Sequence, residues 1–218
     1  MPLDMTEAFA FWPPLTEIAA AVNGGRSTAR AEAAKALARI REFDGTINAF
    51  TSVDPADVAA RASAVDARIA AGERLPLAGV PVAIKDNIWV KGRRITQGSK
   101  LFRDFIAPED AEAVARLVAA GAVVIGIANT SEFAAKGQTT NLLHGATRNP
   151  WNTAMTPGGS SGGPVAAVAS GMVPLALGTD AGGSSRRPPA HTGLVGLKPS
   201  FGAIPYGPGF EEPFFGIS

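Results

Sequence analysis

The stretch GVPVAIKDN at residues 79–87 and the stretch AVVIGIA at residues 122–128 decide the predicted fold. Residues 79–84 are apolar and rich in β-branched side chains, which is typical of a short strand. The polar residues Lys85, Asp86 and Asn87 end this strand. Residues 122–128 are apolar without interruption, as in a strand that is buried on both faces of a sheet. Between them, residues 108–120 predict a helix. Strand, helix and strand in this order indicate a parallel α/β sheet.

The flanking segments extend this α/β pattern. Before the first strand, helices are expected over residues 15–23, from Ser27 or Thr28 to residue 43, and from residue 55 to Gly72. This makes the first 72 residues a helical N-terminal segment.

Beyond the second strand, a helix over residues 164–170 and a buried strand over residues 172–177 lead into the loop GTDAGGSS at residues 178–185. Chemistry in open α/β sheets gathers beyond the carboxyl ends of the strands. Lys85, at one strand end, and the loop 178–185, at another, are therefore candidates for a common site.

Composition narrows the possible functions. The chain has 218 residues, of which 20 are Lys or Arg and 19 are Asp or Glu, so a net charge of +1 provides no basic field for nucleic acid. Without cysteine there is no disulfide, thiol nucleophile or thiolate metal site, and two histidines offer little to a metal. We expect neither a metal nor an organic cofactor, and a small partner without strong charge.

The two chain ends carry separate indications. The start, MPLDMTEAFAFWPPLTE, is acidic and proline-containing where a secretory signal would be basic and then apolar, so we expect a cytoplasmic protein. No apolar stretch approaches the length that spans a bilayer, and no membrane association is expected. Residues 209–218 carry three phenylalanines that need covering, which suggests a partner chain, a homodimer or a missing C-terminal half.

Two glycine-rich segments with hydroxyl groups, residues 156–163 and 178–185, leave three interpretations open. Phosphate binding by backbone N–H groups is one, but no G-x-x-x-x-G-K-[ST] motif is present. An α/β-hydrolase is another, because residues 158–162 satisfy G-x-S-x-G and Asp180 and His191 follow, although no strand is predicted before the serine. The third is a serine hydrolase whose base is a lysine, which must be buried to be neutral.

The third interpretation gains support from a family resemblance. Lys85 follows an apolar strand that leads it into an interior, although a solvated lysine would also fit this position. Seven motifs and the single residue Arg186 resemble, in order, the amidase signature family from the second helix to Pro205: INAF at 47–50, LAGVPVAIKDN at 77–87, SEF at 131–133, TRNPW at 147–151, PGGSSGG at 157–163, GTDAGGS at 178–184, Arg186, and GLKP at 196–199.

The resemblance implies a Ser–cis-Ser–Lys triad. Ser184 is then the nucleophile, Ser160 the bridging serine after a cis bond to Gly159, and Lys85 the base. The family's oxyanion hole falls on the backbone N–H groups of the loop that ends at the nucleophile, namely Ala181, Gly182, Gly183 and Ser184. Ser161 and Ser185 are expected to be structural. The family's fold implies α/β/α layers with a mixed, largely parallel central sheet flanked by helices.

The resemblance also implies an activity, with alternatives. The expected reaction is hydrolysis of a small-molecule carboxylic amide to an acid and ammonia or an amine through an acyl-enzyme. The alternatives are an amidotransferase A subunit, which releases ammonia from glutamine for a partner chain, and a catalytically silent fragment or interaction protein. Family domains are about twice as long, so residues 1–218 correspond to the N-terminal portion of a single amidase domain.

Some residues depart from the family pattern, and the adjacent pair Arg186 and Arg187 raises the question of substrate charge. Ile127 stands where many members have lysine, and Ser185 replaces a branched apolar residue. One arginine, which we assign as Arg187, could bind the carboxylate of an acidic substrate, as malonamidase-like members suggest. The alternative is a structural salt bridge.

Overall fold

The computed structural model of the chain describes residues 12–205 and 207–209. Its four-stranded sheet has the order β1-β3-β2-β6. β2 (Pro81–Lys85) pairs in parallel with β3 (Val123–Ala128) and with β6 (Leu175–Leu177), whereas β1 (Phe50–Val53) is antiparallel to β3. The predicted α/β class with a mixed, largely parallel sheet is confirmed.

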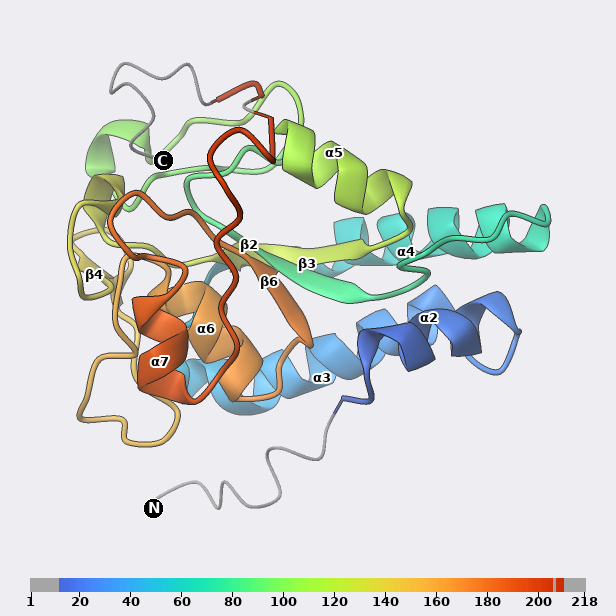
Figure 1. The fold of residues 1–218 in the computed structure, drawn as a ribbon, viewed down its shortest axis with the longest axis horizontal. Coiled ribbons are helices and arrows are strands. Elements are labelled where there is room, and N and C mark those ends of the chain that lie inside the picture. Colours follow the sequence, from blue (N-terminus) through green and yellow to red (C-terminus); the bar gives the residue numbers. More distant parts are fainter. Residues whose placement is uncertain (1–11, 206, 210–218) are drawn as a thin grey trace.

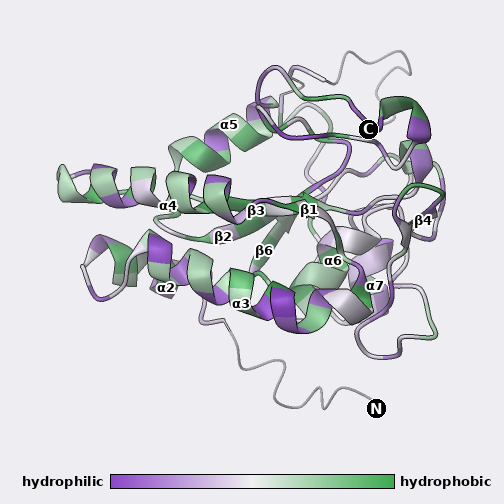
Figure 2. Cartoon of the chain, turned by 180° about the vertical axis from the view of Figure 1, so that it is seen from behind, coloured by the Kyte–Doolittle hydropathy of each residue, from purple (hydrophilic) through white to green (hydrophobic). Residues whose placement is uncertain are grey.

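Helices lie on both faces of this sheet (Figure 1). One face is covered by α2, α3, α4 and α6, and the other by α5 and the loop that precedes it. In Figure 2 the strands are coloured mainly hydrophobic, whereas α3 alternates between hydrophilic and hydrophobic stretches, as expected for a helix with one buried side. The six α-helices of the described ranges are α2 (Leu15–Asn23), α3 (Ala29–Ile47), α4 (Pro55–Ala70), α5 (Glu112–Ala119), α6 (Gly162–Ala169) and α7 (Arg187–Thr192).

Alternation along the central strands divides the core into two apolar clusters. Ala83 and Ile125 belong to the cluster shared with α2, α3, α4 and α6, and Ile84 and Val124 belong to the cluster shared with α5. All four side chains are fully buried. Successive residues of a strand point to opposite faces, so Lys85 follows Ala83 toward the α6 side of the sheet.

Capping residues set the helix boundaries that the sequence indicates. Thr28 accepts a hydrogen bond from the Ala31 N–H at the start of α3, and Asp54 accepts from the N–H groups of Ala56 and Asp57 at the start of α4. Gly72, with φ of 92°, follows the end of α4. α3 continues to Ile47 instead of ending at residue 43, and it packs mainly along α4.

Some elements of the described ranges were not predicted, among them β1, the two-stranded hairpin of β4 (Thr140–Asn141) and β5 (Gly145–Ala146), and the short helix α7. The strand β1 lies between α3 and α4 and therefore interrupts the expected helical segment. It spans only four residues. Of the strand expected over residues 172–177, only the part from Leu175 forms β6. Met172 and Val173 are buried in the core.

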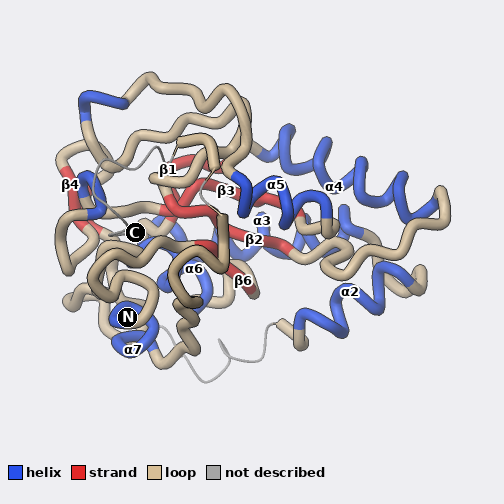
Figure 3. Tube along the Cα trace, turned by 45° about the horizontal axis from the view of Figure 1, so that its top comes forward, coloured by secondary structure: helices blue, strands red, loops and turns tan. Residues whose placement is uncertain are grey.

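Long loops gather at one end of the sheet, opposite the end toward which α2 and α4 extend (Figure 3). They include the segments that follow β2 and β3, and Lys85 is the last residue of β2.

No helix in the described ranges is both long and apolar enough to cross a membrane. The expectations for residues 1–11 and for the aromatic residues 210–218 lie outside the described residues.

Candidate active site

Lys85 is the largest fully buried side chain of the chain's described part, with none of its surface exposed. Its Nζ contacts the Ser160 Oγ at 2.8 Å and the Thr179 Oγ1 at 2.7 Å. Burial lowers the pKa of Lys85 from its ordinary value of 10.5 to about 7, although the charge of Asp180 acts in the opposite direction. At neutral pH a large share of this amine is therefore unprotonated and able to accept a proton.

Two threonine hydroxyls hold the backbone of Ser160, two residues before the start of α6. The Gly159–Ser160 peptide bond is cis, as the resemblance implies. The Ser160 carbonyl accepts hydrogen bonds from the Thr130 Oγ1 at 3.1 Å and the Thr139 Oγ1 at 3.2 Å, and all three residues are buried. Ser160 thus has little freedom to move relative to the lysine.

Asp180 organises the loop that leads to Ser184. Its carboxylate accepts hydrogen bonds from the backbone N–H groups of Gly183 at 2.6 Å and Ser185 at 3.1 Å, and from the Ser185 Oγ at 2.9 Å. Arg186 adds a two-pronged ion pair, with Nε–Oδ2 and Nη2–Oδ1 distances of 2.9 Å. The hydrogen bond from Arg186 is the main reason why the pKa of Asp180 lies well below its usual range. Hydrogen bonds to this one carboxylate therefore hold the loop in its conformation.

Ser184 lies within this loop and is 7% exposed. Within the described ranges, its side chain makes no hydrogen bond to Ser160, so the structure joins Lys85 to Ser160 but does not form a second link to Ser184. The four predicted oxyanion-hole residues are not equivalent, because the Gly183 N–H already donates to Asp180. The N–H groups of Ala181, Gly182 and Ser184 make no hydrogen bond among the described residues.

The two arginines have different surroundings. Arg186 is the member of the pair in the structural ion pair, with Asp180. Arg187 is exposed and makes no ion pair within the part of the chain that the structure describes. Its guanidinium lies beside Gly137, where an added Cβ would be 3.1 Å from the Arg187 Nη1. The same distance separates the Arg187 Nε from a Cβ added at Gly183, so the Arg187 guanidinium lies next to the Ser184 loop.

The α/β-hydrolase interpretation finds no support in the geometry of the described residues. An α/β-hydrolase needs a strand before its nucleophile, but residues 151–157 contain turns and no strand. Asp180 pairs with Arg186, and His191 is exposed on α7. Ser161 and Ser185 have structural partners, because their hydroxyls donate to the Thr179 carbonyl at 3.3 Å and to Asp180 at 2.9 Å.

Sequence reasoning missed the residues that surround the triad candidates. Thr179 accepts hydrogen bonds from Lys85 and, at 3.1 Å, from the Asn87 Nδ2. Thr130 and Thr139 hold Ser160. Thr179 and Asn87 lie inside quoted motifs and could have been found there, whereas Thr130 and Thr139 carry no local signal. Threonines are common in loops, and only the tertiary fold brings these two to Ser160.

An apolar groove borders the site. It has a volume of about 620 Å³ and extends from Ser161, Thr179 and Ala181 along β6 to the segment at residues 194–205. Most of its lining is apolar, including Val168, Leu175, Leu177, Leu194 and Phe201. A substrate that reaches Ser184 from this side would meet an apolar surface.

Comparisons with known proteins identify the family. The family model named Amidase matches residues 33–214, so the chain belongs to the amidase family. A curated relative, the A subunit of the glutamyl-tRNA(Gln) amidotransferase of Chromohalobacter salexigens, is 45% identical over 190 residues, which are 87% of this chain and 39% of the relative. The chain thus spans less than half the length of the curated relatives that it matches.

Solved structures agree with this assignment. A chain from a vestigial protein complex, described as revealing the evolutionary origins of an s-triazine catabolic enzyme, is 46% identical with a TM-score of 0.82. That match covers 85% of this chain and 41% of the other. A bacterial aryl acylamidase of the amidase signature enzymes is 32% identical with a TM-score of 0.86, covering 90% of this chain and 41% of the other. The predicted amidase-signature fold is confirmed.

Proposed function

We propose that this chain carries the catalytic centre of an amidase that hydrolyses a carboxylic amide to an acid and ammonia or an amine. The observation that carries the proposal is the fully buried Lys85 amine, 2.8 Å from the Ser160 Oγ, with its pKa lowered to about 7. A neutral amine that touches a serine hydroxyl can serve as a general base, which a solvated lysine cannot do at neutral pH.

The proposed reaction proceeds by a proton relay. Neutral Lys85 accepts the Ser160 hydroxyl proton while Ser160 accepts the proton of Ser184, and the Ser184 Oγ bonds to the amide carbonyl carbon. The relay in reverse protonates the nitrogen as its bond to carbon breaks, and the amine departs. Water then attacks the ester formed on Ser184, which releases the acid and restores the serine. In this proposal, the hydrogen bond between Ser160 and Ser184 that is absent among the described residues forms when substrate binds.

Backbone N–H groups of the 181–184 loop stabilise the oxyanion in this proposal. Ala181, Gly182 and Ser184 are the donors that remain, because the N–H of Gly183 donates to Asp180. Asp180 therefore fixes the loop conformation and does not itself contact the oxyanion. Loss of one such donor costs about 3 kcal/mol of transition-state stabilisation in comparable sites.

A serine-reactive fluorophosphonate probe tests this proposal. We expect an adduct on Ser184, located by peptide mass spectrometry, and we expect Ser184→Ala to abolish both labelling and amide turnover without loss of the fold. Lys85→Ala should lower labelling by several orders of magnitude, because it removes the amine that contacts Ser160. The exposed Lys91→Ala is the matched control and should label like the parent. Full activity of Ser184→Ala would rule out this nucleophile.

The curated relative favours a second candidate, an amidotransferase A subunit that releases ammonia from glutamine for a partner. Glutamine turnover that requires added partner chains would support this candidate, whereas turnover of simple amides by the chain alone supports the hydrolase. A folded chain with no adduct on Ser184 and no turnover would identify the third alternative, a catalytically silent fragment or interaction protein.

Arg187 provides a proposal about substrate charge. Its guanidinium has no ion pair within the described ranges and lies next to the Ser184 loop, so we propose that it binds a substrate carboxylate. Arg187→Leu should raise KM about 10- to 100-fold for an amide with a free carboxylate and leave KM for a neutral amide unchanged. The matched variant Arg187→Lys should recover part of this loss. Equal effects on both substrates would contradict this role.

A further inference from the structure

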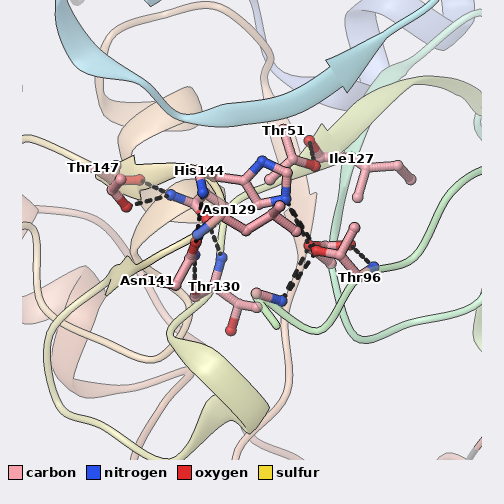
Figure 4. Close-up of polar contacts among 12 residues, drawn as sticks. Thr51, Thr96, Ile127, Asn129, Thr130, Asn141, His144 and Thr147 are labelled. Atoms are coloured by element: carbon pink, nitrogen blue, oxygen red, sulfur yellow. Dashed lines mark hydrogen bonds and ion pairs between the residues drawn. The ribbon is translucent and has the colours of Figure 1, made fainter. Parts of the chain in front are cut away.

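A closed ring of contacts connects the residue after Lys85 to the backbone of Ser160. From Asp86 it passes through Thr96, His144, Asn141 and Thr130 to Ser160, and the contact between Ser160 and Lys85 closes it. Figure 4 shows the central part of this ring, in which Thr96 comes from the loop after β2, Asn141 and His144 from the β4–β5 hairpin, and Thr130 from the segment after β3.

The first part of the ring anchors the end of β2. Asp86 is completely buried and its side chain leaves the strand on the opposite face from Lys85. Its carboxylate accepts hydrogen bonds from the Thr96 N–H at 2.7 Å, from the Thr96 hydroxyl, and from the Gly98 N–H at 3.4 Å. Asp86 thus acts on Lys85 through the backbone that they share, and a shift of this anchor would shift the amine.

The second part of the ring links this anchor to the β4–β5 hairpin. The Thr96 hydroxyl has a single proton, which it gives to Asp86, so the Thr96 Oγ1 must accept from the His144 Nε2 at 3.0 Å. This places the proton of a neutral His144 on Nε2. The His144 side chain is 19% exposed, and Asp86 lies 3.8 Å from its Nε2. His144 thereby fixes the hairpin relative to the end of β2.

The third part of the ring reaches Ser160. The Asn141 Oδ1 accepts from the His144 backbone N–H at 2.6 Å, and the Asn141 Nδ2 donates to the Thr130 carbonyl at 2.8 Å. The Thr130 hydroxyl then donates to the Ser160 carbonyl at 3.1 Å. Each donor has a defined acceptor, so the hairpin transmits the position of one strand end to the serine before α6.

We propose that Thr96 and His144 are positioning residues, which set the distance between the Lys85 amine and the Ser160 hydroxyl by closing this ring. Neither residue touches the reacting atoms. This inference rests on the proposed function of Lys85 and Ser160. It adds the loop at residues 94–98 and the β4–β5 hairpin to the parts of the molecule on which the base depends.

Two pairs of variants of the full chain test the proposal. Thr96→Val keeps the shape of the side chain and removes the hydroxyl, and Thr96→Ser retains it. Likewise, His144→Leu removes the donor, and His144→Gln can keep one near Nε2. His144→Leu leaves the bonds of Asp86 to Thr96 and Gly98 intact, so this variant stays informative if Thr96→Val does not fold. Thr51→Val is the matched control, because its hydroxyl bonds to the Ile127 carbonyl at 3.2 Å outside the ring (Figure 4).

Two measurements are made on each folded variant. The first is kcat and KM for amide hydrolysis, where Thr96→Val and His144→Leu should lower kcat about tenfold or more with KM nearly unchanged. The second is the titration of the Lys85 Cε resonance by NMR, assigned through its loss in Lys85→Met. In these two variants we expect the measured pKa of Lys85 to move toward the ordinary lysine value. In Thr96→Ser, His144→Gln and Thr51→Val, we expect this pKa to remain as in the parent.

The outcomes separate the inference from the function on which it rests. If Thr96→Val and His144→Leu both keep the parent kcat and the parent titration of Lys85, the ring is only structural and the inference is wrong. If Lys85 of the parent itself titrates like an ordinary lysine, Lys85 is not the base. The proposed positioning role of the ring is then wrong as well.

Discussion

At the scale of single residues, one buried amine dominates the chemistry of this protein. Lys85 lies at the end of an apolar strand, and its Nζ contacts two hydroxyl groups instead of a carboxylate. Two hydroxyls satisfy the polarity of an uncharged amine but compensate poorly for a positive charge taken out of water. This explains why burial outweighs the attraction of Asp180 and why the pKa of Lys85 falls to about 7.

The lowered pKa predicts a specific dependence of stability on pH. Between about pH 7 and the ordinary value of 10.5, the unfolded chain keeps the Lys85 proton and the folded chain releases it. The stability of the parent relative to Lys85→Met should therefore rise as the pH increases through this window, by about 2 kcal/mol between pH 7 and pH 9. Urea unfolding of both proteins at pH 6, 7 and 9 measures this. A difference in stability that stays constant across these pH values would show that Lys85 is not perturbed.

At the scale of elements, the close approach of α6 to the sheet places Ser160. Gly163, in the first turn of α6, donates its N–H to the Asn129 carbonyl at 3.1 Å. A Cβ at Gly163 would overlap the backbone N and O of Asn129, and it would lie 2.7 Å from the Ala49 carbonyl. Glycine is thus required here by the distance between two backbones.

Gly163→Ala should destabilise the fold by about 2–3 kcal/mol, because the backbone atoms that it meets cannot move independently. It should also lower activity in the protein that remains folded, since a shift of α6 carries Ser160 away from the lysine. Thermal or urea unfolding and kcat measure the two effects. Gly45→Ala in α3 is the matched control, because nothing lies within 4 Å of its added Cβ and a gain of about 0.5–1 kcal/mol is expected. Equal stabilities of the two variants would contradict this account.

At the scale of the whole molecule, the sheet separates a packed interior from a more open region around the site. Both faces of β2 and β3 are covered by apolar clusters, whereas β6 is only half-buried and borders the apolar groove. The chain spans 39% of the length of the amidotransferase relative described above. Lys85 and Ser160 are nevertheless held by residues of this chain, which is why the proposed catalytic centre can be tested on it directly.

Much of the fold could be predicted from local sequence. The apolar runs that become β2 and β3, the caps Thr28 and Asp54, and the terminating Gly72 each act within a few residues. β1 could not be predicted because its four residues become a strand only by pairing with β3, and the same holds for the two-residue strands of the β4–β5 hairpin.

Local sequence is sufficient for the α/β class, the family and the choice of Lys85, Ser160 and Ser184 as triad candidates, because each lies in a motif whose residues are contiguous. Only the folded chain shows the burial of Lys85 and its contact with Ser160, the hydrogen bond from Gly183 to Asp180, and the ion pair of Arg186 with Asp180. The contact between Lys85 and Ser160 joins residues 75 positions apart, and such contacts, with the burial that accompanies them, follow from packing of the complete fold.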